Sequence, residues 1–415
     1  MKYENNMIGL NEIPNDWEIS LISDFAKVAT GAKDTQNKVD GGQYPFFVRS
    51  QTIERIDSYS FDGEAILTAG DGVGVGKVFH YINGKFDYHQ RVYNIYGFSN
   101  KVYGRYFFEF FKKNFIYQVE KYNAKGSVDS VRMEMITKMN ILIPPFLEQK
   151  KIVAILSNVN EKIEIVDEQI AQCLKLKKGL MQKLLTRGIG HLKFQDSILG
   201  EIPESWEVKT ADQIGIQFID GDRGINYPNE NDFLDRGYCL FLSAKNVTKN
   251  GFRFDECQFI NQEKDDQLRK GKLSLWDIVI TTRGSVGNIA LLDTRVKFTN
   301  IRLNSGMVIL RDGKQIFDKS YLYQYLKSSI FQDQVKTISF GSAQPQLTIK
   351  ELKKIKLLVI PFHEQQQIAT ILTTVDDKLD ILHTKKKSYQ ELKKGLMQQL
   401  LTGKVRVLQS ELLNA

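Results

Sequence analysis

Leu176-Lys177-Lys178-Gly179-Leu180-Met181-Gln182 recurs near the end of the chain as Leu392-Lys393-Lys394-Gly395-Leu396-Met397-Gln398. Both stretches belong to a longer repeat, because residues 148–187 align without a gap on residues 364–403 and 18 of these 40 positions are identical. Chance does not produce such a match. The chain therefore contains one framework segment twice.

A second repeated segment opens each half of the chain. Glu12-Ile13-Pro14-Asn15-Asp16-Trp17 recurs as Glu201-Ile202-Pro203-Glu204-Ser205-Trp206, at an offset of 189 residues rather than the 216 of the longer repeat. The second middle is thus 27 residues longer than the first. Retained ends with divergent centres indicate a constant framework that carries two different recognition units.

Length and composition limit the protein class. A chain of 415 residues fits two to four domains, and 42% hydrophobic with 26% charged residues is ordinary for a soluble globular protein. We find no apolar run long enough for a spanning helix and no signal peptide, so we expect a cytoplasmic protein without a membrane partner. Three cysteines without C-x-x-C spacing and only five histidines predict no metal site. The net charge of +8 favours a polyanionic partner.

The repeated segments have the period of amphipathic helices. Apolar residues recur at spacings of three and four from Ile152 to Ile170 and from Ile368 to Leu382. Helices of about 40 residues span roughly 60 Å, so we expect them to pack against each other as an antiparallel pair that acts as a spacer. The residues expected at the helix-pair or partner contact are Ile152, Ile155, Val159, Ile163, Gly179, Leu180, Ile368, Ile371, Val375, Leu379, Gly395 and Leu396.

Two glycines lie inside the predicted helices, where glycine costs about 1 kcal/mol relative to alanine. Gly179 and Gly395 occupy equivalent repeat positions. They indicate a close backbone approach, either between the two helices or to a partner subunit. The alternative is a helix that already frays near its end.

The two middles, residues 18–143 and 207–360, have the pattern of α+β units. Short β-branched and aromatic runs separated by Gly, Asn and Asp predict strands, and an aromatic-rich helix follows in each middle. The predicted strands are 44–48, 65–68, 238–242, 278–281 and 307–310, and the predicted helices are 103–119 and 321–335.

A shared plan underlies the two middles. Ile66-Leu67-Thr68 before a glycine-rich turn parallels Val279-Ile280-Thr281 before Arg283-Gly284-Ser285. Residues 125–132 also parallel residues 340–347, although the first loop lacks Gln344-Pro345-Gln346, which leaves the equivalence of these loops open. One fold with different side chains is the simplest explanation.

Polar residues beside these turns are the candidate DNA contacts. Arg and Lys recognise guanine, and Asn and Gln recognise adenine, from loops that enter the grooves. For any single residue, an ordinary surface or turn-capping role remains the more frequent one. The candidates are Arg49, Ser50, Gln51, Lys77, His89, Gln90, Arg91 and Lys125 in the first unit, and Lys245, Asn246, Arg283, Asn300, Arg302, Gln344 and Gln346 in the second.

Catalytic motifs are incomplete throughout the sequence. Gly72-Val73-Gly74-Val75-Gly76-Lys77 lacks the first glycine and the Ser or Thr of a phosphate-binding loop. Ile143 occupies the place where Asn or Asp precedes Pro-Pro-Tyr/Phe in amino-methyltransferases, and isoleucine cannot accept a hydrogen bond. We therefore expect no catalytic residues and a non-enzyme.

The duplicated E-I-P-x-x-W, the I-P-P-F-L-E-Q-K-K-I and I-P-F-H-E-Q-Q-Q-I helix starts and the L-K-K-G-L-M-Q helix ends resemble type I restriction-modification specificity subunits over essentially the whole chain. The resemblance implies an α+β fold in which two α/β-mixed target recognition domains are separated by two long antiparallel coiled-coil helices, with a pseudo-two-fold internal repeat. The implied domains are residues 1–145 and 191–360 for DNA recognition and residues 146–190 and 361–415 for the helices.

The same resemblance implies the partners and their cofactors. Each recognition domain would bind one half of a bipartite double-stranded DNA target, and the helices would fix the spacing and dock two methyltransferase subunits. Restriction and translocase subunits complete such complexes. S-adenosylmethionine, ATP and Mg²⁺ would be bound by the partner subunits and none by this chain, which fits the flipped-base chemistry of the family.

Two other function classes remain open on the sequence alone. A non-catalytic coiled-coil scaffold would bind proteins and no DNA. An enzyme with its own methyltransferase or nuclease site would bind S-adenosylmethionine or Mg²⁺ as the isolated chain.

Overall fold

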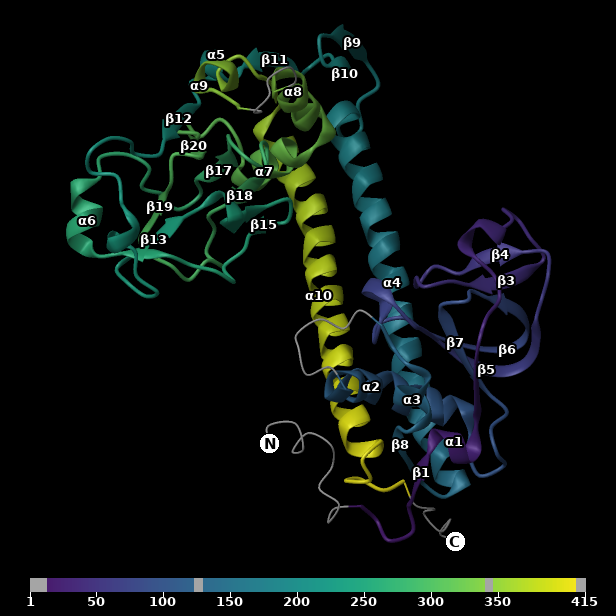
Figure 1. Cartoon of the computed structure of the whole chain (residues 1–415). Helices are drawn as coiled ribbons and strands as arrows, with labels where there is room; N and C mark the ends of the chain where they lie inside the picture. The colour runs from purple at the N-terminus through teal and green to yellow at the C-terminus, as the bar shows by residue number, and fades with distance from the viewer. Residues whose placement is uncertain (1–12, 123–129, 340–345, 408–415) are drawn as a thin grey trace, which may run out of the picture. The chain divides into compact units, whose positions relative to one another are not determined.

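The structure is a computed structural model that describes residues 13–122, 130–339 and 346–407 (Figure 1). The chain divides into two compact units: unit 1 contains residues 1–168 and 384–415, and unit 2 contains residues 169–383. Helix α4 (Phe146–Arg187) begins in unit 1 and ends in unit 2, whereas α10 (Phe362–Leu400) begins in unit 2 and ends in unit 1. The sequence-based boundaries before residues 146 and 361 fall at these helix starts, but the compact units divide each long helix.

Unit 1 is a mixed α/β unit. Its further elements are β1 (Glu18–Leu21), α1 (Ile22–Phe25), β2 (Lys27–Thr30), the 3-10 turn η2 (Thr35–Asn37), β3 (Tyr44–Phe47), β4 (Glu54–Ile56), β5 (Phe61–Ala69), η3 (Gly72–Gly74), β6 (Phe79–Tyr88), β7 (Val92–Tyr96), α2 (Gly104–Tyr122), α3 (Met133–Thr137) and β8 (Asn140–Ile143). Six strands form one sheet in the order β2-β7-β5-β6-β3-β4, and β1 pairs with β8.

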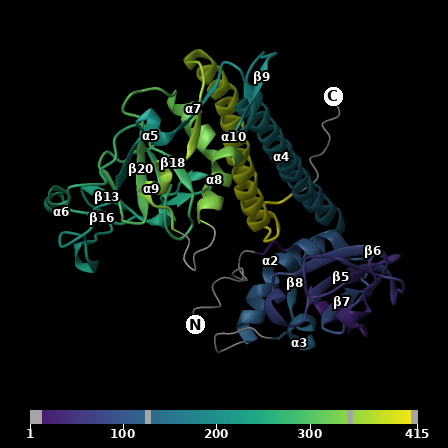
Figure 2. The ribbon, with the colours of Figure 1, turned by 90° about the horizontal axis from the view of Figure 1, so that it is seen from above.

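The core of unit 1 follows from the alternation of side chains along β5. Ile66 faces α2 and packs with Phe107 and Phe111, while Leu67 faces the opposite side of the sheet. Helix α2 contacts β5 and β6 of this sheet (Figure 2). The start of α4 joins this core through Ile152, so the sheet and the long helix share one hydrophobic interior.

Unit 2 is also a mixed α/β unit. Its further elements are β9 (Phe194–Ser197), β10 (Gly200–Pro203), β11 (Glu207–Thr210), α5 (Ala211–Ile214), β12 (Gln217–Asp220), η4 (Glu230–Asp232), β13 (Cys239–Leu242), η5 (Ala244–Asn246), β14 (Val247–Thr248), β15 (Gly251–Phe252), β16 (Phe259–Ile260), α6 (Gln262–Gln267), β17 (Ile278–Thr281), β18 (Ile289–Leu291), β19 (Ile301–Leu303), β20 (Met307–Arg311), α7 (Lys319–Lys327), α8 (Ser329–Ser339), α9 (Ile349–Leu352) and β21 (Lys356–Val359).

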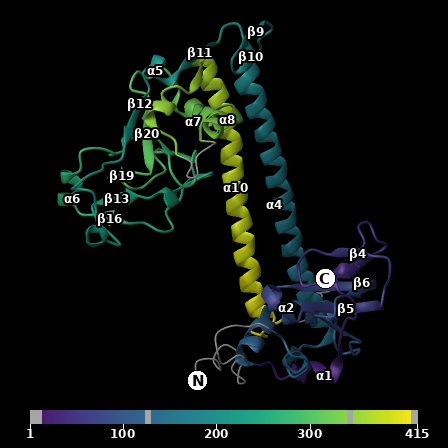
Figure 3. The ribbon, with the colours of Figure 1, turned by 45° about the horizontal axis from the view of Figure 1, so that its top comes forward.

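The aromatic helix expected over residues 321–335 is two helices, α7 and α8, in the structure. Ser328 lies between them with extended backbone angles and donates its hydroxyl to the carbonyl of Tyr325. The start of α10 packs beside both helices, and Ile368 lies in the same core as Tyr325 and Phe331 (Figure 3).

Both units order their strands in the same way. Unit 2 has one sheet ordered β12-β20-β17-β18 and another ordered β16-β13-β19, while β11 pairs with β21. In unit 1 the single strand β6 pairs with both β5 and β3. In unit 2 two separate strands make the corresponding pairs, because β18 pairs with β17 and β19 pairs with β13. The extra residues of unit 2 therefore lie in connections such as those that contain α6 and β14–β15.

The strand register corrects one sequence alignment by a single residue. Ala69 lies opposite Val92 in unit 1, and Thr281 lies opposite Met307 in unit 2. Ala69 is therefore the counterpart of Thr281, and the expected match of Thr68 with Thr281 is wrong. The shared threonine suggested that match, but a slip of one residue would turn Ile66 and Ile278 to opposite faces.

The residues that the two long helices bury differ at one position from those expected from the sequence. Leu372 is fully buried between Ile368 and Val375, whereas Ile371 is 37% exposed, so Leu372 takes the place expected for Ile371. Leu156 is likewise fully buried in α4. The remaining residues expected at the helix-pair contact are buried or partly buried: Ile152, Ile155, Val159, Ile163, Leu180, Ile368, Val375, Leu379 and Leu396.

Neither of the two helix glycines lies at a close contact with the described residues. A Cβ atom added at Gly179 or Gly395 would meet no described atom within 4 Å. Both helices continue beyond these residues, to Arg187 and Leu400. A close approach between the helices at these positions is therefore wrong, and contact with a partner subunit stays a prediction.

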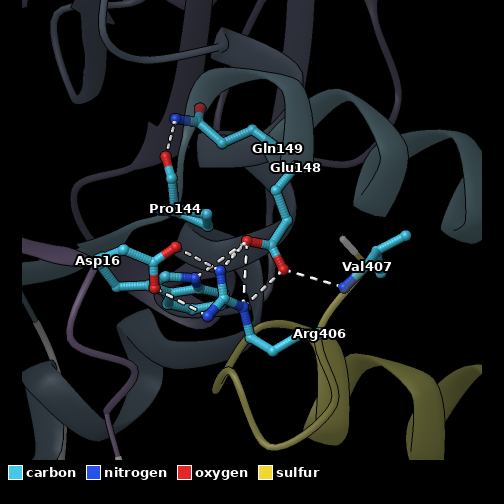
Figure 4. Close-up of polar contacts among 7 residues, drawn as sticks. Asp16, Pro144, Glu148, Gln149, Arg406 and Val407 are labelled. Atoms are coloured by element: carbon cyan, nitrogen blue, oxygen red, sulfur yellow. Dashed lines mark hydrogen bonds and ion pairs between the residues drawn. The ribbon is translucent and has the colours of Figure 1, made fainter. Parts of the chain in front are cut away.

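The buried carboxylate of Glu148, at the start of α4, accepts hydrogen bonds from distant parts of unit 1 (Figure 4). Glu148 accepts hydrogen bonds from the indole of Trp17 at 3.2 Å, the guanidinium of Arg406 at 2.9–3.2 Å and the amide of Val407 at 3.0 Å. Arg406 also donates to both carboxylate oxygens of Asp16, at 2.6 and 2.8 Å. The Glu148 carboxylate thus joins the start of α4 to the E-I-P-x-x-W segment and to the residues after α10.

Glu364 plays the equivalent role at the start of α10 in unit 2. It accepts hydrogen bonds from the indole of Trp206 at 3.0 Å and the amide of Ile189 at 2.9 Å, and it lies 2.8 Å from Nε2 of His191. The closing Gly188 has a φ of +61°, which favours glycine. The repeated tryptophan and glutamate therefore join the end of one long helix to the start of the other in each unit.

Among the described residues, no helix is long and apolar enough to cross a membrane.

Candidate nucleic-acid interface

The loops at one end of the unit 1 sheet bring most of the expected DNA contacts together. The loop after β3, the turn between β5 and β6 and the turn between β6 and β7 meet here. The amide of Gly70 donates to the carbonyl of Arg91 at 2.8 Å, and the amide of Val131 donates to the carbonyl of Gly70 at 2.7 Å. These backbone bonds fix where each loop leaves the sheet.

Asp71 lies at the centre of this cluster. Its Oδ1 accepts a hydrogen bond from Nη1 of Arg49 at 2.9 Å, and its Oδ2 lies 3.7 Å from Nε of Arg91. The side chains of Arg49 and Arg91 are 46% and 64% exposed, whereas that of Asp71 is 21% exposed. The two arginines therefore present guanidinium groups to solvent from a common, partly covered carboxylate.

Two histidines support the same loops from beneath. His89 is buried, and its Nδ1 accepts a hydrogen bond from the amide of Arg91 at 2.9 Å. His80 is also buried, with Nε2 3.1 Å from the carbonyl of Ser50. Burial lowers the pKa of both histidines, so both favour the neutral form. His89, expected as a DNA contact, is thus a support for Arg91 in this structure.

The other expected contacts of unit 1 lie around this cluster. Ser50, Gln51, Lys77 and Gln90 are exposed, and the amide nitrogen of the Gln90 side chain donates to Asp34 at 3.1 Å. Lys125 lies outside the described residues.

Unit 2 builds the corresponding loops on the same hydrogen bonds. The amide of Thr282 donates to the carbonyl of Gly306 at 2.9 Å, and the amide of Leu347 donates to the carbonyl of Thr282 at 3.0 Å. The next residue, Arg283, forms an isolated bridge with Gln346, just as Asp71 does with Ser130 in unit 1. Among the described residues, the loop equivalence left open by the sequence therefore holds for Ser130 and Gln346.

Arg283 and Gln346 are both exposed, so the structure brings two expected contacts of unit 2 together. Lys245 is also exposed, with its ammonium 3.8 Å from Glu256. Asn300 is partly exposed, and its carbonyl accepts the amide of Leu240. Gln344 lies outside the described residues.

Two expected contacts of unit 2 point inward instead. Arg302 is buried, and its Nε donates to the fully buried Asp265 at 2.6 Å. Asn246 is buried, and its side chain bonds Ser243, Arg253 and Glu256 within its own loop. Their polar groups are used inside the unit, so we exclude both from the proposed DNA surface.

Two polar residues of these loops, Asp71 and Arg223, were not among the expected contacts. Arg223 is exposed, lies 2.9 Å from Asp220 and donates to the carbonyl of Ser305 at 3.4 Å, close to the Gly306 turn. The sequence feature that could have identified Arg223 is the Asp220-Gly221 pair just before it, at the end of β12. The backbone is close to another segment at this glycine, because a Cβ atom on Gly221 would lie 2.4 Å from the carbonyl oxygen of Asn304. Thr30-Gly31 at the end of β2 has the same close approach to Tyr88 and His89.

Comparisons with known proteins bear on these surfaces. The sequence model of the type I restriction modification DNA specificity domain matches residues 14–175 and 203–392. The putative type I restriction enzyme MjaX specificity subunit of Methanocaldococcus jannaschii is 29% identical, over 96% of this chain and 96% of that protein. The MjaVIII specificity subunit of the same organism is 28% identical, over 98% and 97%.

A solved structure supports the fold. The S subunit of a type I restriction-modification system from M. genitalium superposes with a TM-score of 0.58 and 18% identity, over 95% of this chain and 98% of that chain. At this identity the likeness concerns the fold alone.

Proposed function

The chain belongs to the type I restriction-modification DNA specificity family, and from this premise we propose that units 1 and 2 each recognise one half of a bipartite DNA target. As a member of that family, it is a non-catalytic subunit that binds DNA and assembles with other type I subunits. The proposal concerns how the chain divides this task between its parts.

The observation that carries the proposal is the pair of equivalent loop clusters. Both clusters rest on the same backbone hydrogen bonds, at Gly70 and Val131 in unit 1 and at Thr282 and Leu347 in unit 2. Each presents exposed arginines, which suit both phosphates and guanine edges. Conserved backbone bonds with different exposed side chains are what two recognition units for different sequences require.

The long helices are proposed to fix the spacing between the two DNA half-sites. Buried residues recur in steps of four and three, at 152, 156 and 159 in α4 and at 368, 372 and 375 in α10. The same spacing is typical of a coiled-coil seam, and it supports the proposal that the two helices pair. Within unit 2, Lys177 of α4 contacts Asp376 of α10 at 2.5 Å, and within unit 1, Lys386 of α10 contacts Asp167 of α4 at 2.6 Å.

Each contact joins the two helices within one unit and supports the proposed antiparallel spacer with a pseudo-two-fold repeat. We propose that the exposed helix faces dock two methyltransferase subunits, which would supply S-adenosylmethionine, and that restriction subunits would supply the ATP- and Mg²⁺-dependent steps.

A non-catalytic scaffold that binds no DNA is the second candidate. The complex with methyltransferase should bind duplex DNA with an affinity that falls steeply as salt rises, because phosphate contacts release counterions. No measurable binding of duplex DNA, even at low salt, would favour the scaffold.

The decisive experiment exchanges residues 18–143 for the corresponding segment of another family member. Methylated adenines are then mapped across the genome with the native and the exchanged gene. We expect one half of the methylated sequence to change while the other half and the spacing stay the same. An unchanged methylation pattern would refute the division of labour between the units.

A further inference from the structure

The backbone around Asp71 is held by several contacts, which an accidental ion pair on the surface would not require. It follows the strand end at Ala69, forms a bridge with Ser130 and is held in place by the backbone bonds of Gly70. Arg49 is also held, because the carbonyl of the next residue, Ser50, lies 3.1 Å from Nε2 of the buried His80. Both partners of the 2.9 Å contact therefore start from fixed backbone positions.

The contact leaves most of the guanidinium available. Arginine has five N–H donors in a planar fork, and the hydrogen bond described for Arg49 uses Nη1. One edge of the fork can still donate two parallel hydrogen bonds. Guanine offers two acceptors, O6 and N7, at the matching spacing in the major groove.

The Asp71 carboxylate also disfavours phosphate, which competes with guanine for Arg49. An unpaired arginine binds any phosphate, and phosphate contacts carry no direct sequence information. Asp71 offsets part of the positive charge that Arg49 and Arg91 together present, which weakens their attraction for a phosphate, and its hydrogen bond restricts the plane of the Arg49 guanidinium. An arginine held in this way is better suited to a neutral base edge than to the DNA backbone.

The equivalent position in unit 2 supports a role in recognition rather than in folding. Arg283 replaces Asp71 there, on the same backbone hydrogen bonds and with the same type of bridge. A position that tolerates opposite charges on one backbone is not needed for that backbone. It is free to differ between recognition units.

We propose that Asp71 is a positioning residue that holds Arg49 for a guanine in the half-site recognised by unit 1. The inference rests on the proposed function and adds the base class and the residue that determines it. Asp71 acts through Arg49 and does not itself contact the base.

The test uses the full chain assembled with its methyltransferase subunits and a pool of duplex oligonucleotides randomised in sequence. Bound duplexes are selected and sequenced for the wild type, Asp71→Asn, Arg49→Lys and a control, Asp62→Asn. Asp62 is exposed at the opposite end of β5, so the control removes the same charge away from the cluster. Denaturant unfolding of each variant checks the fold.

We expect the wild type to select a bipartite motif with guanine at one position of the unit 1 half-site. Asp71→Asn should lower the preference for that guanine by about tenfold, a typical contribution of one bidentate base contact. Its affinity for random duplex should stay equal or rise, because a negative charge is lost. Arg49→Lys should lose the same guanine while its net charge is unchanged, and Asp62→Asn should select the wild-type motif.

A wild-type motif that persists in Asp71→Asn and Arg49→Lys would overturn this inference and leave the proposed function standing. Failure of the wild type to select any motif would overturn both. Equal loss of preference in Asp62→Asn would attribute the effect to net charge and also overturn the positioning role.

Discussion

Units 1 and 2 use one backbone arrangement for opposite charges. Asp71 and Arg283 each follow the same strand end and bridge to an equivalent loop, yet one is an acid between two arginines and the other an exposed arginine beside Gln346. The difference shows that the backbone hydrogen bonds fix the loops independently of these side chains. Recognition can therefore diverge without loss of the fold.

A second pair of equivalent positions differs inside the two units. Asp87 and Arg302 both lie on the strand that pairs in parallel with β3 or β13. Asp87 accepts the hydroxyls of Ser58 and Ser60 at 2.8 Å, whereas Arg302 pairs with Asp265. Each unit thus satisfies a buried charge with partners from its own connections.

The largest expected effect comes from Arg302→Ala. The substitution removes the guanidinium from the fully buried Asp265, which keeps Lys272 at 2.6 Å, and should destabilise unit 2 by about 3 kcal/mol. Denaturant unfolding, with segment-resolved hydrogen exchange to assign the loss to unit 2, measures the effect.

Arg283→Ala is the matched control, because Arg283 is exposed. It should change stability by no more than about 0.5 kcal/mol and weaken DNA binding instead. An Arg302→Ala variant of wild-type stability with altered DNA preference would place Arg302 at the interface after all.

Glu148→Gln should destabilise unit 1 by about 2 kcal/mol. The value lies below that for a fully buried pair, because the Arg406 side chain is 22% exposed and keeps Asp16 as a partner. Hydrogen exchange at residues 13–17 and 404–407 should rise.

Glu364→Gln should have a smaller effect, about 1 kcal/mol, since Glu364 has no arginine partner among the described residues. Equal effects of the two substitutions would show that Arg406 contributes nothing to the junction in unit 1.

Gly179→Ala and Gly395→Ala should each stabilise the chain by about 1 kcal/mol, because both positions are helical and open around the Cβ atom. The midpoint of denaturant unfolding measures this. If methyltransferase assembly is lost while stability rises, the glycines contact the partner. Assembly at wild-type affinity would refute the remaining prediction for these residues.

The smallest effect is expected from pH, and it should differ between the units. Burial lowers the pKa of His80 and His89 below the ordinary 6.5. The folded protein binds a proton on these histidines less readily than the unfolded chain does. Their contribution to stability is therefore complete above pH of about 6.5 and is lost as pH falls below it. Protection factors of the amides in β3 and β6, which correct for the intrinsic exchange rate, should therefore fall between pH of about 7 and about 5.5, and less so in a His80→Gln/His89→Gln variant. An unchanged pH dependence in that variant would contradict the assignment.

The sequence predicted the strands around Tyr44, Ile278 and Met307 and both long helices. Short periodic patterns depend on local geometry, which the sequence carries directly. It misplaced Ile371 and aligned Thr68 with Thr281, because several apolar or threonine matches fit one local period and only packing selects among them.

The site was predicted less well than the fold. Arg49, Arg91 and Arg283 are exposed at the expected turns, but Arg302, Asn246 and His89 are buried. A polar residue in a turn-rich segment has the same sequence signature whether it faces solvent or a buried partner. Arg302 needs Asp265, which lies 37 positions away, and local pattern does not identify such a pair.

The sequence by itself determined the duplication, the two long amphipathic helices and the α+β character of the middles, because repeats and periodic burial are properties of neighbouring residues. Only the tertiary structure decided that Glu148 and Arg406, 258 positions apart, share one junction, that Asp71 and Arg283 are counterparts, and which arginines face outward. These outcomes depend on contacts between remote segments, whose geometry is fixed only when the sheets and helices pack.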